Sequence, residues 1–214
     1  TLVRSMQDIH DEGLFASGER DSRLTAMAKR LQALEDESTQ VRSQLETQRQ
    51  LARTDALTGL ANRKAFDERI SEEMAFARQR EAPLALAIAD IDHFKRVNDT
   101  YGHPAGDRAL ALFARILKTR VRATDFCARY GGEEFVMMFP ATNAEMAAQV
   151  VQQVREFVES CGFSYKGEAV PLTASFGVTE FRREDDCAMM LERADKAMYE
   201  AKSTGRNRVC VAQA

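Results

Sequence analysis

Apolar runs and amphipathic segments alternate from Thr54 onward, and the order of their alternation restricts the fold most strongly. The run 84–91, LALAIADI, is apolar enough to be a buried strand. Two more short apolar runs flank a pair of glycines, which predicts a hairpin with strands over 126–130 and 135–139. Periodicity predicts helices over 62–80, 105–121, 142–161 and 185–202, and strands over 170–179 and 209–211.

Within this alternation the order strand–helix–strand–strand–helix–strand occurs in one core. That order is typical of the ferredoxin-like arrangement. We therefore predict an α+β, ferredoxin-like (βαββαβ) domain over residues 54–214, with a sheet that helices cover on one side.

The first 53 residues differ in composition from the rest of the chain, with no proline and only two glycines. Apolar residues recur there at 3-4 spacing, which predicts a coiled coil over residues 1–53, with heptads from about 24. Such a stripe needs a partner, so we expect a homodimer, with polar seam residues that weaken the pairing. The a positions are Leu24, Leu31, Ser38, Leu45 and Ala52, and the d positions are Met27, Leu34, Val41 and Gln48.

Composition argues against several classes of protein. A net charge of −3 is not that of a protein that coats nucleic acid, so no nucleic-acid partner is expected. No apolar run approaches the roughly 18 residues that span a bilayer. Four scattered cysteines and three histidines argue against a zinc site and fit a reducing, cytoplasmic location. The chain opens with Thr1 in mid-pattern, so we expect an upstream sensory region, with or without a membrane segment.

Carboxylates stand at the end of the strand 84–91, at Asp90 and Asp92. The polar segment 92–107 that follows contains Gly102 and Gly106, which permit sharp bends, and is typical of a long surface loop. Strands often end in Asp for turn reasons alone. Carboxylate oxygens from two separate loops are nevertheless ligands that Mg²⁺ prefers, alongside substrate phosphates.

The second pair of carboxylates lies in the hairpin, in the stretch ARYGGEEFVMMF over 128–139. We expect Gly131 and Gly132 to supply the positive φ angles of a tight turn. Glu133 and Glu134 would then lie at its tip. An exposed turn whose acids only increase solubility is the alternative interpretation of this stretch alone.

Five motifs in a fixed order distinguish between these interpretations. They are DALTGLANR at 55–63, DIDHFK at 90–95 with NDTYGH at 98–103, GD at 106–107, RYGGEEF at 129–135 and ADKAMYEAKSTGRN at 194–207. From residue 54 to about 211 the chain resembles the GGDEF family of diguanylate cyclases, with Glu at the third place of the signature, a variant that active members use.

The resemblance implies an enzyme that condenses two GTP molecules into cyclic di-GMP and two pyrophosphates, as a dimer of half-sites. It implies two Mg²⁺ or Mn²⁺ ions per GTP site, with Glu133 also the proton acceptor and Lys95 the cation that stabilises the transition state. The implied metal ligands are Asp90, the main-chain carbonyl of Ile91, Glu133 and Glu134. The implied substrate contacts are the backbone N–H groups of His93 and Phe94, Asn98 and Asp107 for guanine, Leu57 under the base, His103, and Lys202 and Arg206 for the triphosphate.

The motif RATD, from Arg122 to Asp125, is by itself typical of an exposed ion pair. In the family this position is an inhibitory site for the product, so the resemblance implies feedback inhibition by cyclic di-GMP. A second arginine contributes in the family, and Arg155 is a candidate by neighbourhood only.

Two other functions stay open. A catalytically inactive module that senses GTP or cyclic di-GMP would be expected to lose acids at the signature or the strand end, and Asp90, Glu133 and Glu134 are all present. A cyclase with mixed or adenine products would replace the guanine-reading acid by a small polar residue, and Asp107 is retained.

Overall fold

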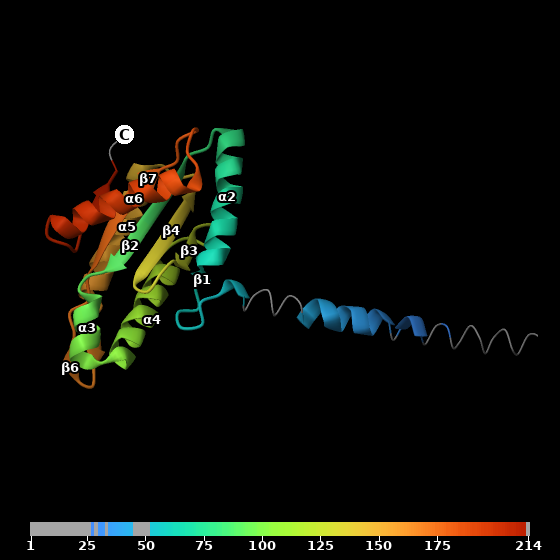
Figure 1. Cartoon of the computed structure of the whole chain (residues 1–214), viewed down its shortest axis with the longest axis horizontal. Coiled ribbons are helices and arrows are strands. Elements are labelled where there is room, and N and C mark those ends of the chain that lie inside the picture. The colour runs from blue at the N-terminus through green and yellow to red at the C-terminus, as the bar shows by residue number, and fades with distance from the viewer. Residues whose placement is uncertain (1–26, 28–29, 33, 45–51, 213–214) are drawn as a thin grey trace, which may run out of the picture. The chain divides into compact units, whose positions relative to one another are not determined.

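The computed structural model describes residues 27, 30–32, 34–44 and 52–212 (Figure 1). Contacts between residues divide the chain into two units, Thr1–Ala52 and Arg53–Ala214. The described residues of the first unit are helical. Four apolar heptad residues on them are between 54% and 66% exposed: Met27, Leu31, Leu34 and Val41. The predicted heptad positions Leu24, Leu45 and Gln48 lie outside the described residues.

The second unit alternates strands and helices. In chain order its elements are β1 (Ala61–Asn62), α2 (Arg63–Arg80), β2 (Leu84–Ile91), α3 (Phe94–Tyr101), α4 (His103–Arg120), β3 (Phe126–Arg129), β4 (Glu134–Pro140), α5 (Ala144–Ser160), β5 (Ser164–Tyr165), β6 (Glu168–Ala169), β7 (Ala174–Glu180), α6 (Cys187–Ser203) and β8 (Val209–Val211). Side-chain caps begin three of the helices, because Asn62, Asn143 and Asp186 each accept a backbone N–H from the first turn. Across the described stretches, no helix is both long and apolar enough to cross a membrane.

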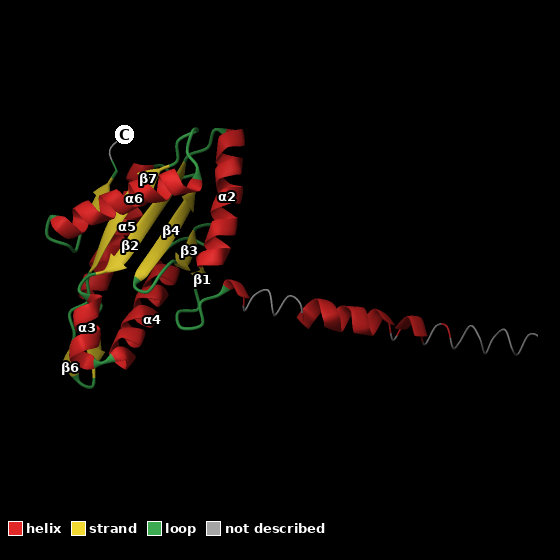
Figure 2. Ribbon diagram, in the orientation of Figure 1, coloured by secondary structure: helices red, strands yellow, loops and turns green. Residues whose placement is uncertain are grey.

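Six strands form the main sheet in the order β1-β3-β4-β2-β7-β8 (Figure 2). The strand β2 lies at its centre, antiparallel to β4 on one side and to β7 on the other. The series β2, α4, β3, β4, α5, β7 has the βαββαβ order, and its strands lie side by side as β3-β4-β2-β7. The predicted ferredoxin-like arrangement is therefore confirmed.

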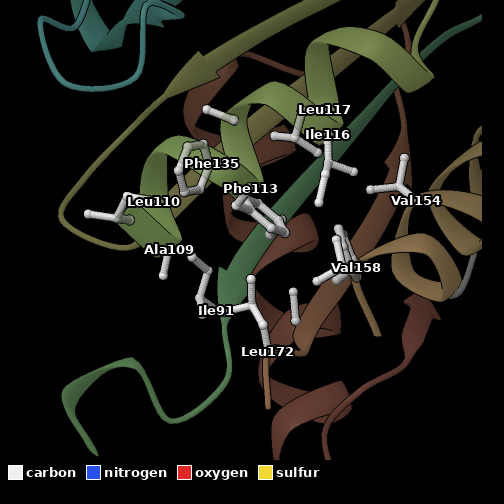
Figure 3. Packing of buried hydrophobic residues seen from close by; sticks show 14 of the residues in the cluster. Ile91, Ala109, Leu110, Phe113, Ile116, Leu117, Phe135, Val154, Val158 and Leu172 are labelled. Atoms are coloured by element: carbon white, nitrogen blue, oxygen red, sulfur yellow. The ribbon is translucent and has the colours of Figure 1, made fainter. Parts of the chain in front are cut away.

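Helices cover both faces of the sheet, so the expectation of cover on one side was wrong. Alternate residues of β2 point to opposite faces. Ala85, Ala87, Ala89 and Ile91 belong to a core cluster with α4 and α5, which includes Phe113, whose ring centroid lies 4.8 Å from that of Phe135 (Figure 3). Leu84, Leu86 and Ile88 belong to a second cluster with α2 and α6. The helices α2 and α6 lie outside the βαββαβ series and close its otherwise open face.

The segment expected to be a long loop after β2 is mostly helical. Phe94 and Val97 on α3 are buried and Tyr101 packs against the same core, a spacing of three and four residues that marks one helix face. The helix α4 also begins earlier than predicted, at His103, with Pro104 in its first turn.

Candidate active site

Asp90 lies at the end of the central strand and is only 5% exposed. Its register partners are Glu134 on β4 and Ser175 on β7. Because side chains alternate along β2, Asp90 lies on the same face as Leu86 and Ile88, which is the face that α6 covers. The Lys202 ammonium at the end of α6 lies 2.8 Å from Asp90 Oδ2. A buried carboxylate and a cation from distant parts of the chain thus meet at one strand end.

The hairpin brings a second carboxylate to this point. The carbonyl of Glu133 accepts a hydrogen bond of 3.4 Å from the Ile91 N–H. Burial raises the pKa of the Glu133 carboxyl, and the negative charge of Asp90 adds to that effect. Burial likewise raises the pKa of Asp90, against the hydrogen bond from Lys202. The acids therefore repel one another and favour any cation that can lie between them.

Neither glycine of the hairpin has a positive φ angle, so the predicted reason for them was wrong. A Cβ on Gly131 would lie 2.7 Å from Glu134 Oε2, whereas one on Gly132 would meet nothing within 4 Å. A larger residue at position 131 would collide with the Glu134 side chain, which lies over Gly131.

Arg129 joins the hairpin to the turn that holds Leu57. Its guanidinium donates to the Gly132 carbonyl at 2.7 Å and to Asp55 at 3.2 Å. Asp55 in turn accepts from the backbone N–H and hydroxyl of Thr58. Leu57 lies in this braced turn and is 38% exposed, which leaves an apolar side chain available to a ligand.

The start of α3 follows directly on Asp90. His93 has a φ of 55° and precedes the helix without a side-chain cap. The first N–H groups of a helix have no partner inside it and favour anions. Lys95 is exposed, and its ammonium makes no ion pair with the residues that the structure describes. This strand end therefore faces unpaired donors as well as acids.

Asn98 and Asp107 come from neighbouring helices. Gly106 on α4 lies against Asn98, since a Cβ there would overlap the Asn98 amide oxygen and touch the Phe94 ring. Gly106 thus permits close helix packing and makes no bend, unlike Gly102 with its φ of 83°. Asp107, in the first turns of α4, and His103, its first residue, are both exposed.

A tight turn follows α6 and carries the second predicted triphosphate residue. Arg206 is exposed and has a φ of 64°, and its backbone N–H donates to the Ala201 carbonyl at 2.9 Å. Gly205 and Asn207 on either side also have positive φ angles, of 127° and 46°. Lys202 thus lies in the last turn of α6, and Arg206 lies in the turn that follows this helix.

Comparison with known proteins assigns the family. The family model described as "Diguanylate cyclase, GGDEF domain" matches residues 52–208. The chain belongs to the GGDEF family. Diguanylate cyclase DgcP of Pseudomonas aeruginosa is 43% identical over 211 residues, which are 99% of this chain and 31% of that protein. Diguanylate cyclase A of Treponema denticola is 38% identical over 168 residues, 77% of this chain and 45% of the relative. The chain thus spans less than half the length of these two curated relatives.

One solved structure in the family matches most of the chain. It is the coiled coil and GGDEF domain of DgcB from Caulobacter crescentus in complex with c-di-GMP, with a TM-score of 0.82 and 37% identity over 87% of this chain and 99% of that one. The active GGEEF domain of a diguanylate cyclase from Vibrio cholerae matches with a TM-score of 0.68 and 32% identity, over 72% and 99% of the two chains. The Glu at the third signature place therefore has a precedent in a solved domain.

Sequence reasoning gave Asp92 in the GGDEF domain no role of its own. Asp92 is 5% exposed, and its Oδ1 accepts from the Ser175 hydroxyl at 2.7 Å. Its Oδ2 accepts from the Thr173 hydroxyl at 2.8 Å and from the Asn207 N–H at 3.0 Å. Its position one residue beyond the end of β2, two residues from Asp90, was a usable signal.

The RATD motif forms a turn rather than the ion pair of the alternative interpretation. Asp125 Oδ2 accepts from the Arg122 backbone N–H at 2.9 Å, and the Asp125 N–H donates to the Arg122 carbonyl at 3.0 Å. The Arg122 guanidinium is exposed beside a groove of about 630 Å³ that Leu60, Lys118 and Phe126 also line. Arg155 is engaged elsewhere, with Glu159 and Asn207, so its guanidinium is not free for that groove.

The oxygen donors of the GGDEF strand end fit a divalent ion held jointly with a nucleotide. Within the described residues, no three His, Cys, Asp or Glu side chains form a cage for a metal by themselves. Mg²⁺ is commonly held by one or two carboxylates plus substrate phosphates, and keeps its remaining ligands as water. The pKa values of Asp90 and Glu133 are raised, so a positive charge bound between the two carboxyls would stabilise their ionised forms.

Proposed function

We propose that this chain is a diguanylate cyclase that joins two GTP molecules into cyclic di-GMP with release of two pyrophosphates. The observation that carries the proposal is the meeting of Asp90, Glu133 and Lys202 at the end of β2, beside the open helix start of α3. Acids, a cation and backbone donors at one point are what a triphosphate and its metal ions require. The names of the relatives agree with this activity.

Each reaction step forms one bond and breaks one. The 3′-oxygen of one GTP attacks the α-phosphorus of the second, pyrophosphate leaves, and Glu133 takes the hydroxyl proton. A raised pKa suits Glu133 to that task. Lys95, free of internal ion pairs among the described residues, would stabilise the charge that develops on the phosphoryl oxygens.

The family uses divalent ions, and we propose two per site, Mg²⁺ or Mn²⁺, held by Asp90, the Ile91 carbonyl, Glu133 and Glu134. When bound, such ions lower the pKa of the attacking hydroxyl and neutralise the leaving group. The N–H groups of His93 and Phe94, with Lys202 and Arg206, would hold the phosphates.

Recognition of the base would rest on Asn98 and Asp107. Guanine presents N1–H and N2–H₂ as donors, and a carboxylate can accept both. The close packing of Asn98 against Gly106 brings α3 and α4 together at this place. Leu57, in the turn braced by Asp55, would pack under the base, and His103 lies at the start of the same helix as Asp107.

Two such sites must face one another, because each domain holds one GTP and the product needs two. We propose residues 1–53 as the dimerising coiled coil and 54–214 as the catalytic domain, with the upstream sensory region in the rest of the protein. The exposed apolar residues of the first unit support this division. We also propose a cytoplasmic location for this part of the protein.

We further propose that cyclic di-GMP inhibits the enzyme at Arg122 and Asp125. The open groove beside the exposed Arg122 supports this site. Arg122→Ala should leave the initial rate within a few-fold and raise the plateau of product, and an identical plateau would refute the inhibitory role.

The deciding experiment incubates the purified chain with GTP and Mg²⁺ and identifies the nucleotide product by mass spectrometry. Cyclic di-GMP with two equivalents of pyrophosphate is the expected outcome. Binding of GTP or cyclic di-GMP without turnover would instead support the inactive sensing module. A product containing adenine from mixed GTP and ATP would overturn the role of Asp107.

A further inference from the structure

The turn after α6 holds three consecutive residues in the left-handed region, Gly205, Arg206 and Asn207, with φ angles of 127°, 64° and 46°. Glycine adopts such angles freely, and asparagine tolerates them, but an arginine does so at a cost. A strained turn persists only when its surroundings hold it. The backbone conformation of Arg206 therefore depends on contacts that its neighbours make.

One contact comes from the sheet. The Asn207 N–H donates to Asp92 Oδ2 at 3.0 Å, and Asp92 is itself fixed by the hydroxyls of Thr173 and Ser175. Asp92 is 5% exposed, so its carboxylate is a rigid, charged acceptor two residues from Asp90.

A second contact comes from α5 on the solvent side. The Asn207 amide oxygen accepts from Arg155 at 2.9 Å, and its NH₂ group donates to Glu159 at 2.8 Å. Arg155 and Glu159 also pair with each other at 2.8 Å. Asn207 is thus held through its backbone on one side and through its side chain on the other.

We propose that Asp92 and Asn207 form a clamp that positions Arg206 for the β and γ phosphates of GTP. Neither residue of the clamp touches the reacting atoms, and both are positioning residues. The proposal rests on the proposed function. It gives the second acid of the DxD sequence a task different from that of the first, because Asp90 meets the Lys202 ammonium on α6 and Asp92 fixes the turn that carries Arg206.

The test compares three variants with the unmutated chain. Asp92→Ala removes the acceptor of the Asn207 N–H, and Asp92→Asn keeps one oxygen that can accept it while the Ser175 hydroxyl turns to accept from the new amide. Asn207→Gly removes only the solvent-side contacts and tolerates the positive φ, so it tests the clamp without disturbing the core. Ser175→Ala is the matched control, because it removes a bond to Asp92 on the oxygen that does not face the turn.

The kinetic measurement is KM for GTP together with inhibition by GMP, which lacks the β and γ phosphates. Asp92→Ala and Asn207→Gly should raise KM for GTP on the order of tenfold, with the inhibition constant of GMP unchanged. Asp92→Asn should recover most of the loss, and Ser175→Ala should stay within about twofold. Equal changes for GTP and GMP, or an unchanged KM in Asn207→Gly, would overturn the proposal.

Hydrogen exchange of the peptide 204–208 tests the clamp independently of turnover. Exchange should accelerate in Asp92→Ala and Asn207→Gly and not in Ser175→Ala, and unchanged protection in the first two would refute the clamp. If the unmutated chain makes no cyclic di-GMP, the proposed function fails while this measurement still decides whether the clamp exists.

Discussion

Asp90 on β2 and Asp92, one residue beyond the end of β2, have different environments. Asp90 meets the Lys202 ammonium, and Asp92 meets two hydroxyls and one backbone N–H. The sequence places both acids at a strand end but does not predict this division, because the partners come from β7 and from the end of α6, more than 80 residues away. The local sequence pattern thus identifies candidate site residues, but tertiary contacts decide which partners each of them has.

Glu133→Gln should abolish turnover while the fold persists. Loss of a general base and metal ligand should lower kcat about a hundredfold or more in Mg²⁺. Since burial, and then the charge of Asp90, raise the pKa of Glu133, removing the negative charge should also raise the thermal midpoint measured without divalent ions at neutral pH. Glu168→Gln, at an exposed position on β6, is the control. A variant that keeps more than about a tenth of the rate would contradict the assignment.

The pair of Asp185 and Arg193 should give stability a marked acid dependence. Both guanidinium NH groups of Arg193 lie 2.6 Å from the buried Asp185 carboxylate. Burial opposes ionisation, but these hydrogen bonds outweigh it and hold the pKa of Asp185 below its ordinary value of 3.8. The pair therefore stabilises the fold above that pH, and the gain disappears as pH falls through the lowered pKa.

Arg193→Met should accordingly lower the free energy of unfolding by about 3 kcal/mol at pH 7. The difference from the unmutated chain should shrink below pH 3.8. Arg183→Met is the control, because its ion pair with Glu81 is 67% and 80% exposed and should contribute under about 1 kcal/mol. Urea unfolding at pH 7 and below pH 3.8 measures the free energy of unfolding of each variant. An equal loss of stability for the two variants at pH 7 would contradict the prediction.

Among whole elements, the long apolar or strongly periodic ones were predicted, whereas the short helix α3 and the two-residue strands β1, β5 and β6 were missed. The strand 84–91 matches β2 residue for residue, and the hairpin strands match β3 and β4 to within one residue. The helix α3 was read as a loop because Asn98, Asp99 and Gly102 dominate its composition, although Phe94, Val97 and Tyr101 carry its buried face.

Gly177 on β7 lies directly against the backbone of α6. A Cβ there would lie closer than 3.0 Å to backbone atoms of Ala194, Ala197 and Met198 on α6. Backbone cannot yield as a flexible side chain can, so Gly177→Ala should displace α6 and destabilise the domain by about 2 kcal/mol or more. Gly132→Ala is the control, since a Cβ there meets nothing within 4 Å and its stability should change by less than about 0.5 kcal/mol. Thermal and urea unfolding compare the two, and equal stability would contradict the packing argument.

At the scale of the whole chain, the heptads bear on how two chains pair, whereas the catalytic motifs bear on the nucleotide site within one chain. The nucleotide site that we propose lies in the unit Arg53–Ala214, whereas the apolar stripe of the other unit has no cover within the described residues. Sequence periodicity predicts the pairing but not its geometry, because register and orientation depend on a second chain.

A truncated chain that begins at Thr54 should bind GTP and turn it over slowly. A coiled coil raises the concentration of one half-site near the other, on the order of millimolar, and the truncated chain loses that gain. Leu31→Ser with Leu34→Ser should act likewise, whereas Glu35→Gln on the same helix should not. Activity per chain across a dilution series, with sedimentation of the same samples, provides the measurement. Equal activity in a monomeric truncated chain would refute the half-site argument.

In the proposed site, the ion pair between Lys202 and Asp90 couples the binding of the metal to the binding of the nucleotide. Asp90 already has a counter-ion at 2.8 Å, so a bare divalent ion gains little by displacing it. A nucleotide that arrives with its metal offers Lys202 a phosphate in return for the carboxylate. On binding, Lys202 would exchange Asp90 for a phosphate and Asp90 would exchange Lys202 for the metal ion, so that neither charge loses an opposite charge. Metal and nucleotide should therefore bind together, and neither should bind strongly alone.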